Sequence, residues 1–405
     1  MNPAAFAARQ QNERRIIEYV VINGETSRVT LANSLGLSTA TVTNIVTDLL
    51  ERKLLFESRQ EKSTVGRKTT LLQFNGDLHY LLTVEIKTDQ TLKIAITNLV
   101  GKLLTSQTIT CNIEVTAACQ KTQVLKNIIS TLTAFMNAQP EPVRKKVKMI
   151  GLCLHGMVNA SKTFDVPGLN WKNMNLTMPL QVALGIPVYA EGITRILANY
   201  EMRFIDPSEK NVLYLNMSTG IGMVHFFDRK MVMGKTGIAG EVGHISLNLH
   251  GPQCYCGNRG CFEYYCGMNY VLQRAEALLT EENKLDPFYD MVLNQKLPLT
   301  PELLFQAQQA GSLLIHELLC SVSEYLGVGL ANLYNIYDPD RIIVSMTPET
   351  DGNFLLENAK IEARSRIVNQ FSRELNISCA HLTGSQLHRA ISDYVLCQYL
   401  DSLYD

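Results

Sequence analysis

The feature that most constrains the fold is a cluster of potential metal ligands in one short stretch of the chain. Four such side chains stand within 18 positions: His244, Cys254, Cys256 and Cys261. Imidazole and thiolate groups at this spacing suit a single tetrahedral zinc ion, and four protein ligands leave no coordination position for water. Pro252, Gly257 and Gly260 permit the tight turns that such a loop requires. The stretch therefore predicts a structural site for one Zn²⁺ per chain.

Two other interpretations of the cysteines stay open. The chain has ten cysteines, and its first residues, MNPAAFAARQQNERR, lack the apolar core of a secretory signal. Disulfides are therefore not expected, and reduced thiols without a metal are the alternative to the zinc site. Cys266 is close enough in sequence to compete as a ligand, but it lies past the turn and is expected to be buried.

Residues 1–72 predict a DNA-binding domain of the winged helix-turn-helix type. The pattern indicates helices over residues 14–23, 26–36 and 39–55, the third capped by Ser38. We expect these helices to bury two sets of apolar residues, Val29, Leu31, Ala32 and Leu35 in the second and Val42, Ile45, Val46, Leu49 and Leu50 in the third. The short turn LGLS between them matches the helix-turn-helix plan, in which the second helix of the pair enters the major groove.

The start of the third helix presents small polar side chains that suit base edges and phosphates. The expected DNA-binding residues there are Thr39, Thr41, Thr43 and Asn44. Two extended runs follow and indicate a wing, with Arg67 and Lys68 near its basic tip. Between residues 9 and 68 the chain has 10 Lys/Arg against 7 Asp/Glu, a modest basic excess. The alternative interpretation is a three-helix module that binds a protein.

Residues 78–405 predict a second domain of α/β class. Strands are expected over residues 80–87, 91–98, 102–110, 147–158, 211–234 and 341–346, and helices over 116–138, 300–337 and 385–405. This order repeats a β-meander followed by helices, which is typical of two lobes with a ligand cleft between them. Residues 57–70 are the expected hinge between the two domains.

Charge and hydropathy narrow the class of protein further. The chain carries 37 Lys+Arg against 38 Asp+Glu, so any contact with nucleic acid must be local. The most apolar run, residues 149–158, falls short of the roughly 18 residues that a membrane span needs. We therefore expect a cytoplasmic protein without a membrane segment.

The stretches GIAGEVGHISLN and CYCGNRGCFE resemble the signature of the ROK family, which contains sugar kinases and sugar-responsive repressors. The winged helix-turn-helix ahead of them is similar to the repressor branch. The resemblance implies a two-lobed actin/hexokinase-like (ribonuclease H-like) domain and zinc on the four ligands named above. It also implies an effector site lined by Glu241, His244, Glu263 and Asn170, the last in the family-like stretch PGLNWKNMNL. Carboxylates suit sugar hydroxyls because they accept charge-assisted hydrogen bonds.

Three departures from the family's kinases argue against phosphoryl transfer. The first phosphate segment reads TVEIKTDQT and has no glycine for close backbone approach. The positions that resemble the catalytic Asn-Asp pair hold Gly192 and Ile193, and isoleucine cannot accept a proton. The late segment RIIVSMTPE also lacks glycine, and the surviving Gly220-Ile221-Gly222 is taken as turn geometry. The sequence therefore predicts a protein that is not an enzyme.

We expect double-stranded operator DNA, a sugar or sugar-phosphate effector and a homodimer or homotetramer as partners. Gly192-Ile193 removes one acceptor for a sugar hydroxyl. The effector is therefore expected to be a sugar phosphate or a modified sugar, with a vestigial pocket as the alternative, and Arg195 is a candidate contact for an anionic effector. Two alternatives stay open: a sugar kinase with an appended DNA-binding module, and a repressor controlled by a protein of a sugar-transport system.

Overall fold

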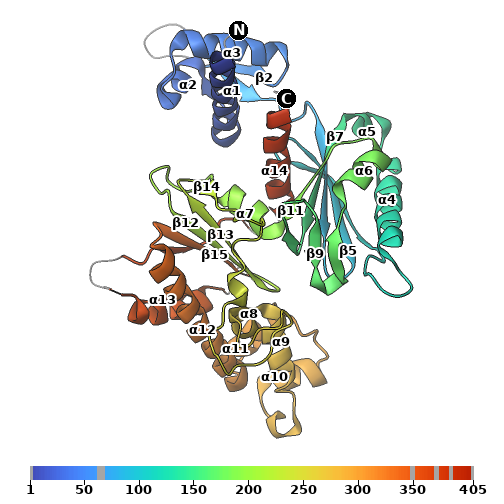
Figure 1. Cartoon of the computed structure of the whole chain (residues 1–405), viewed down its shortest axis with the longest axis vertical. Coiled ribbons are helices and arrows are strands. Elements are labelled where there is room, and N and C mark those ends of the chain that lie inside the picture. Colours follow the sequence, from blue (N-terminus) through green and yellow to red (C-terminus); the bar gives the residue numbers. More distant parts are fainter. Residues whose placement is uncertain (1–2, 62–68, 347–351, 369–373, 383–385, 403–405) are drawn as a thin grey trace. The chain divides into compact units, whose positions relative to one another are not determined.

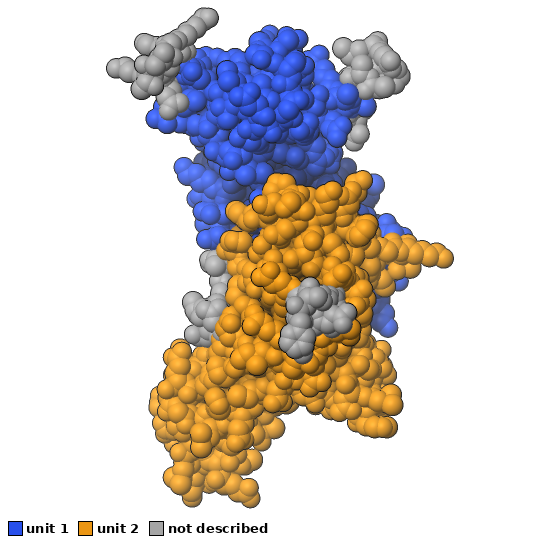
Figure 2. All heavy atoms as spheres, turned by 90° about the vertical axis from the view of Figure 1, so that its left-hand side faces the viewer, with its two compact units in different colours: residues 1–203, 384–405 blue, residues 204–383 orange. Residues whose placement is uncertain are grey.

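The structure is a computed structural model and describes residues 3–61, 69–346, 352–368, 374–382 and 386–402 (Figure 1). The chain divides into two compact units, residues 1–203 with 384–405, and residues 204–383 (Figure 2). We call residues 3–74 the N-terminal module, the rest of the first unit lobe 1, and the second unit lobe 2. Because this division places the N-terminal module with lobe 1, the boundary expected between residues 72 and 78 stays a prediction.

The N-terminal module is a three-helix unit with a small sheet. Its elements are α1 (Pro3–Asn23), β1 (Thr26–Ser27), α2 (Arg28–Leu35), α3 (Thr39–Glu51), β2 (Leu55–Glu61) and β3 (Thr69–Phe74), with sheet order β1-β3-β2. The Ser38 side chain caps α3 by accepting from the backbone N–H of Thr41 at 3.1 Å, as expected. The two extended runs form the antiparallel pair β2–β3. The residues between them, 62–68, lie outside the described part of the chain.

Two expectations for this module are wrong. The first helix begins at Pro3 rather than near residue 14. Val29 is 60% exposed although its spacing placed it on the buried face of α2. Only Leu31 and Ala32 of that set are buried, because an eight-residue helix buries a narrow stripe. Most of the predicted core of α3 is buried, namely Val42, Ile45, Val46 and Leu49.

Lobe 1 is built on a five-stranded sheet of order β11-β7-β4-β5-β6. The strands are β4 (Tyr80–Ile86), β5 (Thr91–Asn98), β6 (Leu103–Thr110), β7 (Val147–Leu154) and β11 (Val188–Gly192). A smaller sheet joins β8 (Met157–Val158), β9 (Phe164–Val166) and β10 (Trp171–Met174). The helices are α4 (Lys121–Asn137), α5 (Glu141–Lys146), η1 (Pro167–Leu169), α6 (Thr177–Leu184), α7 (Ile193–Glu201) and α14 (Leu387–Ser402). The meander β4–β5–β6 is antiparallel, whereas β4, β7 and β11 run parallel.

Lobe 2 has a second five-stranded sheet, of order β14-β13-β12-β15-β16. Its strands are β12 (Val212–Met217), β13 (Ile221–Phe227), β14 (Lys230–Met231), β15 (Arg341–Met346) and β16 (Ile377–Cys379). Here too the first three strands form an antiparallel meander, and β12, β15 and β16 run parallel. Each lobe therefore places the first strand of its meander at the centre of the sheet.

The helices of lobe 2 bury its sheet. They are η2 (Val242–His244), α8 (Phe262–Cys266), α9 (Met268–Glu276), η3 (Glu281–Asn283), α10 (Pro287–Tyr289), η4 (Asp290–Asn294), α11 (Pro301–Gln309), α12 (Leu313–Tyr337) and α13 (Gly352–Arg366). Among the described residues, α12 alone is long and apolar enough to cross a membrane by length and composition, which we did not expect from the sequence. Leu319, Val322 and Leu326 of this helix are fully buried in the core of lobe 2. Such burial is ordinary for the central helix of a globular lobe.

Candidate functional site

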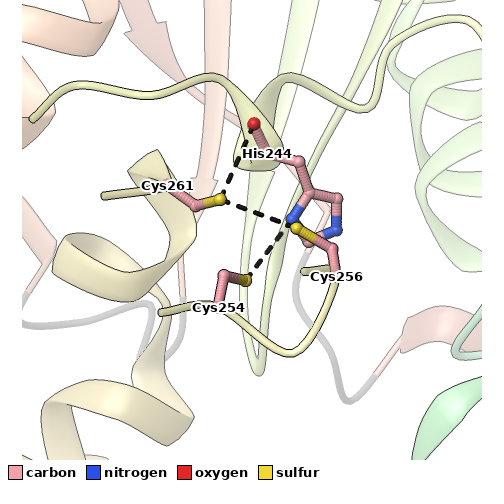
Figure 3. A group of neighbouring side chains, drawn as sticks. All are labelled: His244, Cys254, Cys256 and Cys261. Carbon is pink, nitrogen blue, oxygen red and sulfur yellow. Dashed lines mark hydrogen bonds between the residues drawn. The ribbon is translucent and has the colours of Figure 1, made fainter. Parts of the chain in front are cut away.

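The structure brings the four predicted metal ligands together in one loop, residues 244–261, which we call the cysteine loop (Figure 3). The potential ligand atoms of His244, Cys254, Cys256 and Cys261 all lie within 4.8 Å of one another. Cys256 Sγ lies 3.7 Å from Cys261 Sγ, and Cys254 Sγ lies 3.8 Å from His244 Nδ1. The cluster is the one group of this kind among the residues that the structure describes.

The spacing of these atoms fits a tetrahedral metal ion. Zn–S bonds of about 2.3 Å at tetrahedral angles separate two sulfurs by about 3.7 Å, whereas a disulfide separates them by about 2.0 Å. Burial and the neighbouring thiols raise the pKa of Cys261 to about 12, so this thiol resists ionisation when no cation is bound. A bound cation removes this penalty because the thiolate is the form that ligates. The residues present can therefore hold a metal ion with His and Cys ligands.

Glycines shape the cysteine loop as expected. Gly257 and Gly260 have positive φ angles of 92° and 61°. A Cβ atom on Gly260 would stand 1.8 Å from the carbonyl oxygen of Asn248. The backbone of this turn therefore requires glycine, independently of any ligand. Cys266 points away from the cluster, and its thiol donates to the carbonyl oxygen of Val322 at 3.4 Å, so the expected burial of Cys266 is confirmed.

Glu263 follows the cysteine loop and is held in place by the sheet of lobe 2. It is 7% exposed, and its Oε2 accepts from the backbone N–H of Ile221 at 2.8 Å. A Cβ atom on Gly220 would stand 2.5 Å from Glu263 Oε2. The glycine that we interpreted only as turn geometry therefore makes room for this carboxylate at the β12–β13 turn. Glu241 immediately precedes η2, and its side chain is exposed.

Tyr255, which the sequence did not single out, joins His244 to Glu263. Its hydroxyl lies 3.2 Å from His244 Nε2, and the two rings meet edge to face at a centroid distance of 5.3 Å. Burial raises the pKa of Tyr255, and the charge and hydrogen bond of Glu263 raise it further. The hydroxyl of Tyr255 is therefore protonated and in contact with two of the residues expected to bind an effector.

The remaining expected effector residue, Asn170, belongs to lobe 1. It lies after η1 in the left-handed region (φ 54°), and its side-chain amide donates to Glu114 at 2.9 Å. Ile193 is the first residue of α7, directly after β11.

The carboxyl ends of the parallel strands of lobe 1 carry a group of charged side chains. Glu85 Oε1 lies 2.8 Å from His155 Nε2, and both side chains are largely buried. Glu191 Oε1 accepts from Arg195 at 3.2 Å, and Lys162 lies 3.4 Å from its other oxygen. Open α/β sheets commonly bind ligands at this edge. In this chain Arg195, the candidate contact for an anionic effector, is ion-paired with Glu191.

The candidate DNA-binding face of α3 is open to solvent. Thr39, Thr43 and Asn44 are exposed and Thr41 is partly exposed. The Thr43 hydroxyl donates to the carbonyl oxygen of Thr39 at 2.8 Å, which leaves its oxygen lone pairs for a partner. The ion pairs Arg9–Asp48 and Arg52–Glu13 tie α1 to the later part of α3 and to the residue that caps its end. Arg67 and Lys68 lie outside the described residues.

A family model described as the ROK family matches residues 82–386. The xylose repressor of Bacillus subtilis (strain 168) is 26% identical over 398 residues, which cover 98% of this chain and 97% of the repressor. The DNA-binding transcriptional repressor Mlc of Escherichia coli (strain K12) is 22% identical and covers 93% of this chain and 90% of its own length. The dual regulator NagC of the same organism is 24% identical and covers 83% of this chain and 80% of its own length.

Solved structures share the fold. A ROK family transcriptional regulator, described as a homolog of the E. coli MLC protein, superposes with a TM-score of 0.77 at 22% identity and covers 98% of this chain and 99% of its own. A ROK family glucokinase from Streptomyces griseus, in complex with glucose and AMPPNP, gives 0.63 at 21% identity and covers 78% of this chain and 98% of its own. The expected fold class, a winged helix-turn-helix followed by a two-lobed actin-like domain, is confirmed. Because a regulator and a kinase share the two-lobed part, that part alone does not decide between their activities.

Proposed function

The chain belongs to the ROK family, and we propose that it is a sequence-specific transcriptional repressor of carbohydrate genes, controlled by a sugar or sugar-phosphate effector. One observation carries the proposal. The family model begins at residue 82, whereas the similarity to the xylose repressor covers 98% of the chain and so extends through the winged helix-turn-helix. Such a protein acts in the cytoplasm, where its operator lies.

In this proposal α3 reads the operator from the major groove through Thr39, Thr41, Thr43 and Asn44. Their exposure at the first turns of α3 supports this role. Arg67 and Lys68 of the wing contact the DNA backbone or the minor groove. Since two helix-turn-helix modules bind a palindrome through two-fold symmetry, the active species is a homodimer or homotetramer.

One Zn²⁺ per chain, held by His244, Cys254, Cys256 and Cys261, has a structural role in this proposal. Four protein ligands saturate the ion, so it organises the cysteine loop rather than activating water. The loop in turn fixes the positions of Glu241, His244 and Glu263. These side chains bind the effector. Asn170 of lobe 1 is proposed as an effector contact separately, from the resemblance of PGLNWKNMNL to the family. Glu263 supports this role because it is buried and its Oε2 accepts from the Ile221 N–H, which fixes a carboxylate with further acceptor capacity for a ligand hydroxyl.

The same proposal excludes kinase activity. Ile193 stands where the family resemblance places the residue that takes the proton from the sugar hydroxyl, and an aliphatic side chain cannot accept a proton. The β4–β5 turn, which resembles the first phosphate segment, is closed on itself. Asp89 accepts from the Thr91 N–H at 3.1 Å and pairs with Lys87 at 3.1 Å. ATP turnover with D-glucose, D-xylose and N-acetyl-D-glucosamine is therefore expected to be absent, and a robust rate that Ile193→Asp does not increase contradicts this point.

A route for control of DNA binding runs through the first unit. α7 starts directly after Gly192 and packs against α14. Asp401, in the last turn of α14, pairs with Arg14 of α1. An effector that binds one arrangement of α7 better than another shifts the equilibrium of the N-terminal module by that difference in affinity.

The test uses the full chain and a pool of random DNA duplexes. Repeated selection is expected to enrich one palindromic sequence, and a gel-shift titration is expected to show that Asn44→Ala weakens its binding by about tenfold or more, because one bidentate base contact contributes ~1–3 kcal/mol. Asn358→Ala, an exposed asparagine on α13 of lobe 2, is the matched control. If no sequence is enriched, the chain is not a sequence-specific regulator.

The same gel shift, repeated with each sugar and its phosphate, tests the effector. Release or tightening of the complex by one of them supports direct control. If none acts on the purified protein but an extract of sugar-grown cells does, control by a protein of a sugar-transport system replaces the effector in the proposal.

A further inference from the structure

We propose that Tyr255 is a latch on the effector site: its hydroxyl fills the place between His244 and Glu263 that a ligand hydroxyl takes in the complex. The proposal rests on the proposed function, because it names the group that the effector must displace. It concerns lobe 2 alone, and all three residues come from the cysteine loop or the helix that follows it.

The geometry places the phenol hydroxyl at the polar centre of the site. It lies 3.2 Å from His244 Nε2, and the ring stands perpendicular to the imidazole at 86°. The Glu263 carboxylate is near enough to hydrogen-bond to the same hydroxyl. Glu263 itself is fixed by the Ile221 N–H, so the hydroxyl meets a carboxylate that cannot turn away.

The hydrogen-bond directions follow from the metal site. His244 turns Nδ1 toward Cys254 and Nε2 toward Tyr255. When Nδ1 ligates the metal, the ring proton resides on Nε2, which then donates to the Tyr255 oxygen. Tyr255 donates its own proton to Glu263. A sugar hydroxyl accepts one hydrogen bond and donates another in the same way, so the phenol and the sugar compete for one place.

The side chain can leave this place without unfolding the loop. Tyr255 stands between the ligands Cys254 and Cys256, which hold its backbone, yet the residue is 58% exposed. Rotation of the side chain therefore breaks the contacts of the hydroxyl and removes little packing. A ligand binds only to the fraction of molecules in which the latch is open, so the latch raises the apparent dissociation constant by the inverse of that fraction.

The test compares Tyr255→Phe with Tyr289→Phe in the full-length protein. Tyr289 is the matched control because its hydroxyl also donates to a glutamate of lobe 2, Glu281, at 3.1 Å, outside the cysteine loop. Calorimetric titrations with D-xylose, D-glucose and N-acetyl-D-glucosamine are expected to show binding that is about tenfold tighter in Tyr255→Phe and unchanged in Tyr289→Phe. Equal or weaker binding in Tyr255→Phe overturns the latch, and weaker binding means that Tyr255 contacts the ligand directly.

A second measurement tests the contact between Tyr255 and Glu263 without any sugar, so that its result does not depend on which sugar binds. The protein is labelled with 3-fluorotyrosine, and the Tyr255 resonance is assigned by its loss in Tyr255→Phe. Without any sugar, Glu263→Gln is expected to move this resonance toward that of a solvent-exposed fluorotyrosine, because a neutral amide is a weaker acceptor than a carboxylate. A resonance that does not move overturns the latch. If the resonance moves but no sugar binds to either protein, the latch stands and the sugar effector of the proposed function is wrong.

Discussion

The two lobes share one strand order but differ at the turn that follows the central strand. In lobe 1, the β4–β5 turn is closed by Asp89 with Lys87 and Thr91, and Glu85 at the end of β4 pairs with His155. In lobe 2, the β12–β13 turn contains Gly220, whose missing side chain leaves space for Glu263. The charged groups of lobe 1 thus satisfy one another, whereas in lobe 2 His244 and Glu263 meet the hydroxyl of Tyr255, which we propose that a ligand displaces.

The difference shows that a duplicated sheet does not duplicate a site. Each sheet has an equivalent edge, at the carboxyl end of its central strand. Among the described residues, lobe 2 alone adds a loop with a cluster of metal ligands, which carries His244, and the helix after that loop brings Glu263 to this edge. In the function that we propose, binding at this edge therefore depends on the cysteine loop, on Glu263 and on Gly220 more than on the strands.

The largest expected effect comes from removing the zinc that we propose for the cysteine loop of lobe 2. Cys256→Ser is expected to lose its zinc, measured as metal per chain by elemental analysis, and to lower the melting temperature on the order of 10 °C. The physical reason is that the three remaining ligands no longer close the tetrahedral site, and the loop that carries His244 loosens. Effector binding is expected to disappear with the metal.

Cys379→Ser is the control for this variant, since Cys379 is exposed on β16 and is not part of the metal cluster. A Cys256→Ser protein that retains one metal ion per chain and melts like the control shows that the cluster is not the metal site. The comparison between the lobes then rests on Gly220 and Glu263 alone.

A smaller effect distinguishes the buried carboxylates of the two lobes. Replacing the one in lobe 2 is expected to reduce effector affinity, and replacing the one in lobe 1 is expected to reduce stability. Glu263→Gln is expected to keep its bond to the Ile221 N–H and its fold, but to weaken effector binding by about ten- to a hundredfold, because a hydrogen bond to a charged group contributes ~1.5–3 kcal/mol. Glu191→Gln is expected to lower the free energy of unfolding by ~2 kcal/mol, because Arg195 then lacks its charged partner. Calorimetric titration measures the effector affinity of both variants, and denaturant unfolding measures their stability. If Glu191→Gln loses affinity and Glu263→Gln loses stability instead, the roles assigned to the two lobes are wrong.

The sequence predicted the metal-ligand cluster and the order of several strands and helices along the chain, because both depend on local pattern. The ligands of the cysteine loop lie within 18 positions, so their spacing alone restricts the geometry. Alternating and helical periodicity placed β4, β5, β6, β7 and α14 close to their observed bounds. The pattern could not place Val29, because the width of the buried stripe depends on what α2 packs against.

Contacts between positions far apart in the chain could not be predicted from the sequence. Ile221 and Glu263 are 42 positions apart, and Glu85 and His155 are 70 apart, so no local pattern pairs them. The role of Gly220 follows only from the position of Glu263. Tyr255 had no signal of its own because the direction of a side chain in an irregular loop depends on the folded turn. The assignments of Arg67 and Lys68 to the wing stay predictions.

The smallest effect concerns the Glu85–His155 pair, which on our view only stabilises lobe 1. His155→Gln retains a hydrogen-bond donor for Glu85 and is expected to lower the free energy of unfolding by ~1 kcal/mol, whereas His155→Ala leaves a carboxylate that is largely buried without this partner and is expected to cost ~2 kcal/mol. Metal content and effector affinity are expected to stay unchanged in both, because no part of this pair belongs to the cysteine loop. Denaturant unfolding and effector titration of the two variants test this directly. If either variant loses affinity for the effector while its unfolding free energy is unchanged, the strand ends of lobe 1 contribute to the effector site, and the contrast between a self-satisfied edge and a ligand-binding edge no longer holds.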